Sequence, residues 1–320
     1  MKAVVYDKND SNDKLVLREV EKPIPKDNQV LIKVYAVSLN AADYRSMKMG
    51  IIPKNKIFGS DISGKIEAVG KDITKFSIDD EVFGDISACG FGGLAEYVAV
   101  SENALTFKPH GISFESAAAV PMSAVTALQA LRNKGNIQKG QTVLIYGAGG
   151  GVGTFAVQLA KYYDTEVTAV CGERNVDLMR SLKADFVIDY HKDDFSQSNK
   201  RYDLVIAVNG NRSLSTYKHV LSTNGIYVNI GGALSQVFKS ILFGGLMSIG
   251  SKKMRFLAAK PNIEDLKFII KLVEEGQIIP VVDKLYPFYE TSEAMKYISN
   301  GHAQGKVIVV FVGDIVKDPL

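Results

Sequence analysis

The sequence predicts an α/β protein with two domains, one rich in β-strands and one built on a doubly wound parallel sheet. Three observations carry this prediction: a length of 320 residues, a change of texture after Pro109, and a glycine-rich turn between a strand and a helix. Because domains usually span about 100 to 200 residues, a chain of this length is expected to fold around two hydrophobic cores.

The composition is that of an ordinary soluble protein, with 46% apolar residues, 23% charged residues and a formal net charge of +3. Basic residues are spread along the chain rather than clustered, so we expect no nucleic-acid partner. The two cysteines are too few for a disulfide scaffold. The most apolar stretch, Ile241 to Gly250, is half of the about 20 residues that a membrane span needs. We therefore expect a cytoplasmic protein without a membrane partner.

The first third of the chain reads as mostly β. Short alternating segments at Lys2 to Tyr6, Gln29 to Val37 and Gly64 to Val69 are separated by Pro, Gly, Asn and Asp residues. After them, Phe114 to Leu131 is rich in Ala and predicts a helix. This shift in composition indicates a domain boundary near residue 118.

From Gln141 on, strands alternate with helices. The predicted strands are Thr142 to Tyr146, Glu166 to Cys171, Phe186 to Tyr190, Tyr202 to Val208, Ile226 to Ile230 and Met254 to Ala258. Helices are predicted at Gly151 to Tyr163, Val176 to Leu182 and Ser213 to Leu221. Six strands with helical crossovers imply a doubly wound parallel sheet. The remaining tail is mixed again and is expected to rejoin the β-rich first third.

The glycine-rich turn predicts a dinucleotide-binding site. It follows an apolar strand directly and opens a helix with apolar residues at helical spacing. Free backbone N–H groups and the positive end of the helix would hold a pyrophosphate there. A glycine motif alone also suits a flexible loop, but the strand and helix around it meet the structural condition for a nucleotide site. The residues expected to line the site are Ala148, Gly149, Gly150, Gly151, Val152 and Gly153.

The residues after the second strand of the parallel sheet favour NADPH over NADH. An acidic side chain there would bind the ribose hydroxyls and repel a 2′-phosphate. Glu173 has the spacing from Gly153 that such an acid needs, but the strand itself ends at Cys171. Gly172 and Arg174 come next, and the planar charged side chain of Arg174 suits a phosphate. A solvated surface cation is the alternative interpretation of Arg174.

Several motifs resemble the medium-chain dehydrogenase/reductase superfamily, which includes alcohol dehydrogenases, and within it the zinc-free NADPH:quinone oxidoreductase and enone reductase branch. They are Gly59 to Gly64, Asp80 to Val82, Gly92 to Val98, Ala117 to Pro121 and Gly305 to Val307. The resemblance implies a GroES-like catalytic domain at residues 1–118 and 262–320, with a Rossmann dinucleotide-binding domain at 119–261. It also implies a homodimer and an active site between the domains.

The residue inventory agrees with the zinc-free branch. Catalytic zinc needs about three protein ligands, usually thiolates and imidazoles. Where zinc-dependent relatives carry a Cys and a Gly-His-Glu, this chain has Ser38 to Asn40 and Gly59 to Asp61. We therefore expect no metal. Without a Lewis acid, reduction of an electrophilic quinone or enone is easier than oxidation of a simple alcohol.

The resemblance also implies roles for individual residues. Asn40 would fix a carbonyl or the cofactor ribose, while Tyr44 and Arg45 would donate to the acceptor oxygen. Asp43 would order the loop, and its alternative is an ordinary turn residue or helix cap. Simple packing is the alternative for Tyr44. Residues expected to contact the cofactor, each with a turn or packing alternative, are Tyr190, Val208, Asn209, Gly231, Phe256 and Leu257. Thr126 would lie near the nicotinamide, and its alternative is a helix-interior hydroxyl that bonds to its own backbone. Lys306 would help to bind a cofactor phosphate, and its alternative is a lysine that faces solvent.

The sequence thus predicts an NADPH-dependent, zinc-free reductase of a small-molecule quinone or α,β-unsaturated carbonyl. Two alternatives stay open: a zinc-free alcohol or aldehyde dehydrogenase on the same fold, and an NADPH-binding module without turnover. The polar set of Asn40, Tyr44, Arg45 and Thr126 favours an enzyme, because a binding module would not require it.

Overall fold

The computed structural model describes residues 1–10, 14–231, 248 and 250–311, and these divide into two compact units. Unit 1 contains Met1–Met122, Pro261–Glu274 and the described residues from Pro280 on. Unit 2 contains Ser123–Lys260 and the short segment Glu275–Ile279. Most of the apolar stretch at 241–250 lies outside the described residues.

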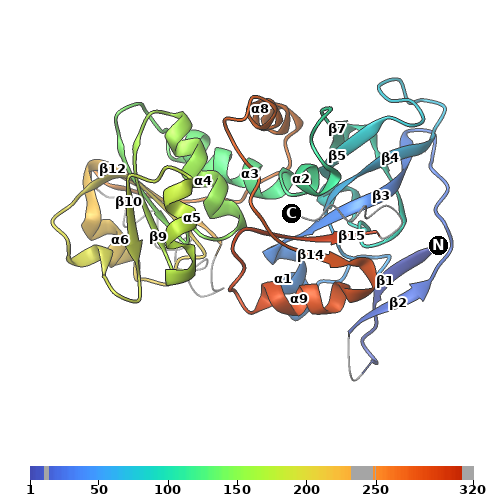
Figure 1. Cartoon of the computed structure of the whole chain (residues 1–320), viewed down its shortest axis with the longest axis horizontal. Coiled ribbons are helices and arrows are strands. Elements are labelled where there is room, and N and C mark those ends of the chain that lie inside the picture. The colour runs from blue at the N-terminus through green and yellow to red at the C-terminus, as the bar shows by residue number, and fades with distance from the viewer. Residues whose placement is uncertain (11–13, 232–247, 249, 312–320) are drawn as a thin grey trace. The chain divides into compact units, whose positions relative to one another are not determined.

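Unit 2 is built on a six-stranded parallel sheet with the order β10-β9-β8-β11-β12-β13. Figure 1 labels three of its strands, β9, β10 and β12. Its strands are β8 (Thr142–Tyr146), β9 (Glu166–Cys171), β10 (Phe186–Asp189), β11 (Tyr202–Val208), β12 (Leu221–Ile230) and β13 (Lys253–Phe256). The order runs outward in both directions from the β8–β11 pair, which makes the sheet doubly wound. The predicted fold class is therefore confirmed, although β12 begins earlier than expected because Leu221 already pairs with Tyr202.

Helices of unit 2 connect these strands. They are α3 (Pro121–Leu128), which continues as a π-helix over Gln129–Lys134, α4 (Gly151–Tyr162), α5 (Val176–Ser181) and α6 (Leu214–Val220). The segment Phe114 to Leu131 is helical as predicted, but it is divided in two, because α2 (Phe114–Ala118) ends before Pro121 and α3 begins at it. Proline has no N–H and a fixed φ, so it suits the first position of a helix and not its interior. No described helix combines the length and apolar character needed to cross a bilayer.

Unit 1 is built on a second sheet with the order β14-β15-β3-β4-β5-β7, in which β6 also pairs with β3. Its strands are β3 (Gln29–Leu39), β4 (Asp61–Val69), β5 (Glu81–Asp85), β6 (Tyr97–Ser101), β7 (Leu105–Phe107), β14 (Val282–Pro287) and β15 (Lys306–Val310). A separate hairpin is formed by β1 (Lys2–Tyr6) and β2 (Leu15–Glu19). Because β15 pairs antiparallel with β3, the tail rejoins the β-rich first third as predicted.

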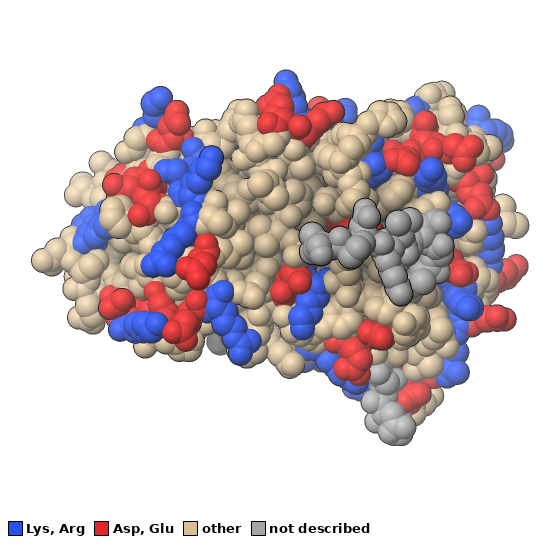
Figure 2. Space-filling view, in the orientation of Figure 1, with Lys and Arg blue, Asp and Glu red and all other residues tan. Residues whose placement is uncertain are grey.

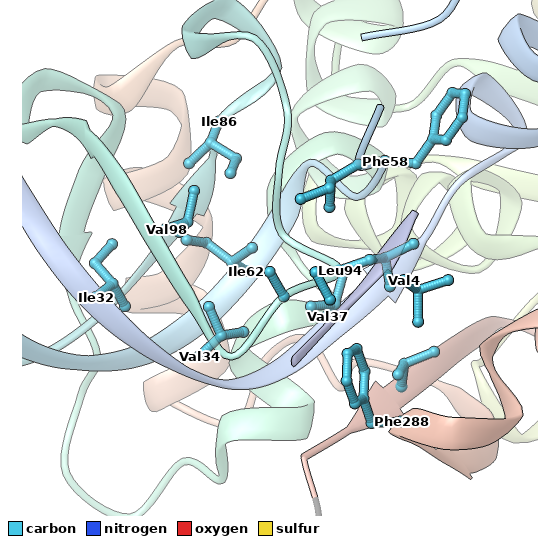
Figure 3. Close-up of a cluster of buried hydrophobic side chains, with 14 of the residues drawn as sticks. Val4, Ile32, Val34, Val37, Phe58, Ile62, Ile86, Leu94, Val98 and Phe288 are labelled. Atoms are coloured by element: carbon cyan, nitrogen blue, oxygen red, sulfur yellow. The ribbon is translucent and has the colours of Figure 1, made fainter. Parts of the chain in front are cut away.

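The core of unit 1 joins its early and late parts. Figure 3 shows apolar side chains of this core, among them Val4, Val37, Ile62, Leu94 and Phe288, and all five are buried. Complete burial of a large apolar side chain stabilises a fold by about 1.5 to 3 kcal/mol, so this core fixes the end of β3 firmly. Around it lie α1 (Ala41–Lys48), α2, α8 (Ile263–Glu274) and α9 (Thr291–Ser299).

Candidate functional site

The parallel sheet of unit 2 gathers most of the predicted cofactor residues at one edge. Because all its strands run in the same direction, their carboxyl ends meet there. These ends carry the turn from Gly147 to Gly153, Gly172, Arg174, Tyr190, Val208, Asn209, Gly231, Phe256 and Leu257. Thr126 lies instead on α3, where it is buried. Contacts of these residues with a cofactor stay predictions.

Two glycines of the turn are required by close backbone contacts. A Cβ on Gly147, whose φ is +77°, would lie 2.2 Å from the carbonyl oxygen of Val208. A Cβ on Gly153 would lie 2.3 Å from the oxygen of Gly147 and 2.5 Å from that of Ala148. Real Cβ atoms do not approach backbone atoms so closely. The turn therefore packs against β11 on one side and against the start of α4 on the other.

Gly150 differs from these two glycines, because it faces open space. Its φ is −86°, and a Cβ there would meet only the oxygen of Gly147, at 3.8 Å. No side chain of the described residues caps α4, whose N-cap is Gly150. An uncapped helix start beside free space is suited to an anion, because its N–H groups and dipole favour negative charge. The diphosphate of a nicotinamide dinucleotide fits these features.

Asn175 contacts the glycine-rich turn and is not among the residues that the sequence predicted for the site. A Cβ on Gly149 would lie 2.4 Å from the side-chain carbon Cγ of Asn175, so this amide packs directly on the turn. Its Oδ1 is buried and has no hydrogen-bond partner among the described residues. A buried acceptor without a donor is costly, and a bound ligand or water would satisfy it. Asn175 follows Arg174 directly in the turn beyond β9, and this position in the sequence could have identified it.

The loops after β9 and β10 hold an ion pair that sequence reasoning did not predict. Lys192 Nζ lies 2.7 Å from Glu173 Oε1 and 3.7 Å from Asp189 Oδ2. Tyr190 packs over Gly172, since a Cβ there would lie 2.9 Å from the tyrosine hydroxyl. Glu173 is the acid that would favour NADH, and the structure gives its carboxylate a cationic partner.

Four strands of unit 1 bring a buried polar cluster together. In the sheet register, Val307 of β15 lies opposite Leu39 of β3, Ser38 lies opposite Asp61 of β4, and Asp61 lies opposite Asp85 of β5. The members of the buried polar cluster, all under 10% exposed, are Asn40, Asp43, Asp61, Asp85 and Lys306. The cluster therefore arises where the ends of neighbouring strands meet.

Asn40 is the centre of the hydrogen bonds in this cluster. Lys306 Nζ donates to Asn40 Oδ1 at 2.6 Å and lies 3.7 Å from Asp61 Oδ2. The Asn40 side-chain NH₂ donates to Asp61 Oδ2 at 3.0 Å and to the carbonyl oxygen of Ser38 at 3.3 Å. Asp61 Oδ1 accepts the N–H of Met122 at 3.1 Å. Both polar ends of the Asn40 amide thus have partners within unit 1, and its contact with substrate or ribose stays a prediction.

Asp43 caps helix α1. Its carboxylate accepts the backbone N–H of Asn40 at 2.8 Å and that of Gly59 at 3.2 Å. The side chain of an acidic residue in the first turn commonly bonds back to the N-cap in this way. Tyr44 and Arg45 follow directly, and the half-buried Tyr44 packs against the core of unit 1. The cap therefore ties the residues predicted to be catalytic to the chain segment before β4.

Burial dominates the ionisation of the cluster. It raises the pKa of Asp61 to about 8 and the pKa of Asp43 to about 6, and it also raises the pKa of Asp85. Burial lowers the pKa of Lys306, whereas the neighbouring Asp61 carboxylate opposes that shift. The Lys306 ammonium lies near three carboxyl groups, those of Asp43, Asp61 and Asp85. Its positive charge offsets the negative charge of carboxyl groups that ionise, so the net charge buried in the core stays small.

The positions at which zinc-dependent relatives bind metal do not fit a zinc ion in this chain. The amide oxygen of Asn40 already faces the Lys306 ammonium at 2.6 Å, and that positive charge would repel a divalent cation. Within the described ranges, no group of three His, Cys, Asp or Glu side chains is arranged to hold a metal ion.

Comparisons with known proteins agree with this architecture. Residues 26–110 match the model of the alcohol dehydrogenase GroES-like domain, and residues 182–309 match that of the zinc-binding dehydrogenases. A chloroplast envelope quinone oxidoreductase homolog of Arabidopsis thaliana is 34% identical, over 91% of this chain and 92% of its own length. An NADPH-dependent alkenal/one oxidoreductase of the same plant is 32% identical, over 97% of this chain and 79% of its own length.

A solved structure extends the comparison to the whole fold. The quinone oxidoreductase from Coxiella burnetii superposes with a TM-score of 0.87 at 29% identity, covering 97% of this chain and 99% of its own. Identity above 30% over most of both chains places this chain with such relatives. The chain therefore belongs to the medium-chain dehydrogenase/reductase superfamily of oxidoreductases, in the group that contains the quinone oxidoreductases and enone reductases.

Proposed function

We propose that this oxidoreductase transfers hydride from NADPH to a quinone or an α,β-unsaturated carbonyl, without zinc. The observation that carries the proposal is the uncapped start of α4 beside open space at Gly150, at the edge where all six strands end. NADPH, when bound, would supply the hydride from its nicotinamide ring. The names of the plant and bacterial relatives support a quinone or enone as the acceptor.

The proposed catalytic residues are Asn40, Tyr44 and Arg45. Hydride addition leaves negative charge on the acceptor oxygen, and donors already in place stabilise that charge most effectively. Tyr44 and Arg45 both carry donors and lie in the first turns of α1, which Asp43 caps. A fixed helix start would hold these donors in one arrangement, so the chain would contribute mainly orientation.

The proposed preference for NADPH rests on Arg174 and Tyr190. Arg174 is exposed in the turn after β9, and Tyr190 packs over Gly172 in the same region. An Arg side chain is suited to a phosphate because its charge is permanent and its donors lie in a plane. The Glu173–Lys192 pair would reduce repulsion of a 2′-phosphate by Glu173. NADH would bind less tightly, because it lacks that phosphate.

A homodimer formed through β13 and a cytoplasmic location complete the proposal. On the face that Figure 2 shows, basic and acidic side chains are interspersed, which fits a small-molecule substrate better than a nucleic acid. One relative, by contrast, is named as a chloroplast envelope protein. Size-exclusion chromatography with light scattering would test the dimer.

The decisive experiment is an oxidation assay with NADPH or NADH against quinones, enones and saturated carbonyls, together with metal analysis of the purified protein. We expect turnover of quinones or enones with NADPH and no stoichiometric zinc. Turnover confined to saturated carbonyls would instead support a zinc-free alcohol or aldehyde dehydrogenase. Tight NADPH binding without turnover of any acceptor would support a binding module, and stoichiometric zinc would overturn the metal-free mechanism.

A further inference from the structure

Lys306 is a charged side chain almost fully enclosed by unit 1. It is 3% exposed and lies at the first position of β15, with its ammonium among the carboxyl groups of Asp43, Asp61 and Asp85. Burying an ammonium is unfavourable unless partners compensate for the lost water. A methionine would fill a similar volume without that cost, so packing alone does not account for a lysine here.

The ammonium lies closer to the amide of Asn40 than to the carboxyl group of Asp61. Lys306 Nζ is 2.6 Å from Asn40 Oδ1 but 3.7 Å from Asp61 Oδ2. On its other end, the Asn40 amide donates to Asp61 Oδ2 at 3.0 Å. The oxygen and the NH₂ group of an asparagine amide have nearly the same shape, so packing alone does not distinguish the two orientations of the amide. One orientation is selected only when a hydrogen-bond donor faces the oxygen and an acceptor faces the NH₂ group.

The orientation of Asn40 bears on helix α1, because Asn40 is its N-cap residue. The side chain is held by Lys306 and Asp61, and the backbone N–H is held by the Asp43 carboxylate at 2.8 Å. Tyr44 lies four residues beyond this anchor. A small rotation at the anchor therefore displaces the first turn and its donors.

We propose that Lys306 is a positioning residue, which fixes the Asn40 amide and thereby the start of α1, and does not itself contact the substrate. The inference rests on the proposed function, in which Asn40, Tyr44 and Arg45 act on the acceptor. It differs from the expectation that Lys306 binds a cofactor phosphate, because its ammonium is directed to partners inside unit 1.

The test uses a charge-balanced pair of substitutions. Lys306→Met alone leaves the Asn40 amide oxygen and the Asp61 carboxyl buried without the ammonium beside them, and we expect a loss of stability. The double variant Lys306→Met/Asp61→Asn removes both buried titratable groups of the pair, so we expect its Tm to return towards that of the wild type. We expect its kcat to stay about tenfold or more below wild type, with the KM for NADPH changed by less than about twofold. Lys306→Arg, which keeps a charged donor, should regain part of kcat.

A matched control comes from a second enclosed lysine in unit 1. Lys108, whose side chain is 6% exposed, lies 2.8 Å from Glu81 Oε2 and donates to the carbonyl oxygen of Ile112 at 2.6 Å. Neither Lys108 nor Glu81 bonds to Asn40 in the described structure. Lys108→Met/Glu81→Gln therefore removes a comparable pair, and we expect kcat to remain at the wild-type level.

A readout independent of activity follows the Asn40 amide itself. In nuclear magnetic resonance spectra, the side-chain NH₂ signals of Asn40 are assigned by their loss in Asn40→Asp. The protons that give these signals should exchange slowly with solvent in the wild type. In the Lys306→Met/Asp61→Asn variant they should exchange about tenfold faster or more, and in the Lys108 control they should not change. This measurement tests the positioning role of Lys306 even if the wild type reduces no quinone or enone. Absence of such activity would contradict the proposed function and not the positioning role.

Three results would overturn the proposal. The first is a Lys306→Met/Asp61→Asn variant that regains kcat together with Tm, because Lys306 would then serve stability alone. The second is unchanged exchange of the Asn40 amide in that variant. The third is a raised KM for NADPH at unchanged kcat, which would make Lys306 the cofactor ligand that the sequence suggested.

Discussion

The two units hold their site residues by opposite means. At the carboxyl ends of the strands of unit 2, where we propose that the cofactor binds, Gly147, Gly150 and Gly153 carry no side chain. The proposed site there consists largely of backbone. At the end of β3 in unit 1, Asn40 and Lys306 belong to a network of buried charged and amide side chains. A phosphate has to approach the backbone N–H groups of unit 2 closely, and side chains there would hinder it. The proposed donors of unit 1 are side chains on a helix, so the start of that helix has to be held in place by other side chains.

This difference predicts two kinds of sensitivity. The turn in unit 2 should respond to added volume and hardly to pH, because it holds no titratable side chain. The buried polar cluster in unit 1 should respond to changes of charge and to pH, because it holds three carboxyl groups whose pKa values burial raises. The predictions that follow test this division.

The largest expected effect is that of Gly153→Ala in the turn of unit 2. The new Cβ would lie 2.3 Å and 2.5 Å from two backbone oxygens, so the turn or the start of α4 has to move. We expect NADPH affinity to fall by about 100-fold, which corresponds to about 2.7 kcal/mol, and Tm to fall as well. Isothermal titration calorimetry and thermal unfolding measure the two effects.

Gly150→Ala is the matched control, because the added methyl group has room in the protein. We expect an unchanged Tm and an NADPH affinity about tenfold lower, since the methyl group would enter the space assigned to the diphosphate. If Gly150→Ala bound NADPH as tightly as the wild type does, the diphosphate would not lie against this glycine.

The second prediction concerns the charges of unit 1. Burial raises the pKa of Asp61 to about 8, whereas an aspartate in an unfolded chain titrates at about 3.9. Between these values the folded state binds a proton that the unfolded chain has released. The free energy of unfolding should therefore fall as the pH rises from about 4 to about 8. Asp43, with its pKa raised to about 6, adds to the slope in the lower part of this range.

Urea unfolding near pH 5 and pH 8 measures this slope. Asp61→Asn removes one titrating group, so the variant should lose less stability between the two pH values than the wild type does, by roughly 1 to 3 kcal/mol. Gly150→Ala should keep the wild-type slope. Equal slopes in the wild type and Asp61→Asn would show that Asp61 does not titrate in this range.

The fold was predictable where its signals are local. Alternation of apolar strands and helical stripes indicated all six strands of the parallel sheet, and the glycine spacing indicated the turn before α4. The Ala-rich segment Phe114 to Leu131 is helical as its composition predicted, but Pro121 begins a second helix within it. Local sequence patterns were thus sufficient to predict the elements. They failed only where one residue, such as Pro121, ends a helix that the composition of its neighbours favours.

The buried polar cluster could not be predicted in the same way. Asn40 and Asp61 are 21 positions apart, and Asn40 and Lys306 are 266 apart, so only the register of three strands brings them together. Lys306 precedes an apolar run and reads from sequence as a lysine facing solvent or a phosphate. The Glu173–Lys192 pair, 19 positions apart and on separate loops, shows the same limit.

The third prediction sharpens the assignment of the cofactor. Arg174→Ala should weaken NADPH binding by about tenfold and leave NADH binding nearly unchanged, because only NADPH carries the phosphate that Arg174 would bind. Arg180→Ala is the control, because Arg180 is an exposed arginine on α5 paired with Asp177. Equal losses for NADPH and NADH would exclude a specific contact of Arg174 with the 2′-phosphate.

The smallest expected effect is that of Lys192→Ala, which removes the cation beside Glu173. The pair is largely exposed, with 63% and 71% of the side chains accessible, so its influence is screened by water and salt. We expect NADPH affinity to fall by about two- to fivefold and NADH affinity to change less, because the freed carboxylate repels only the 2′-phosphate. Glu173→Gln in the same variant should restore the affinity for NADPH. If Glu173→Gln did not restore the affinity, Lys192 would act on the cofactor directly and not through Glu173. The preference for NADPH would then depend on two cations, Arg174 and Lys192.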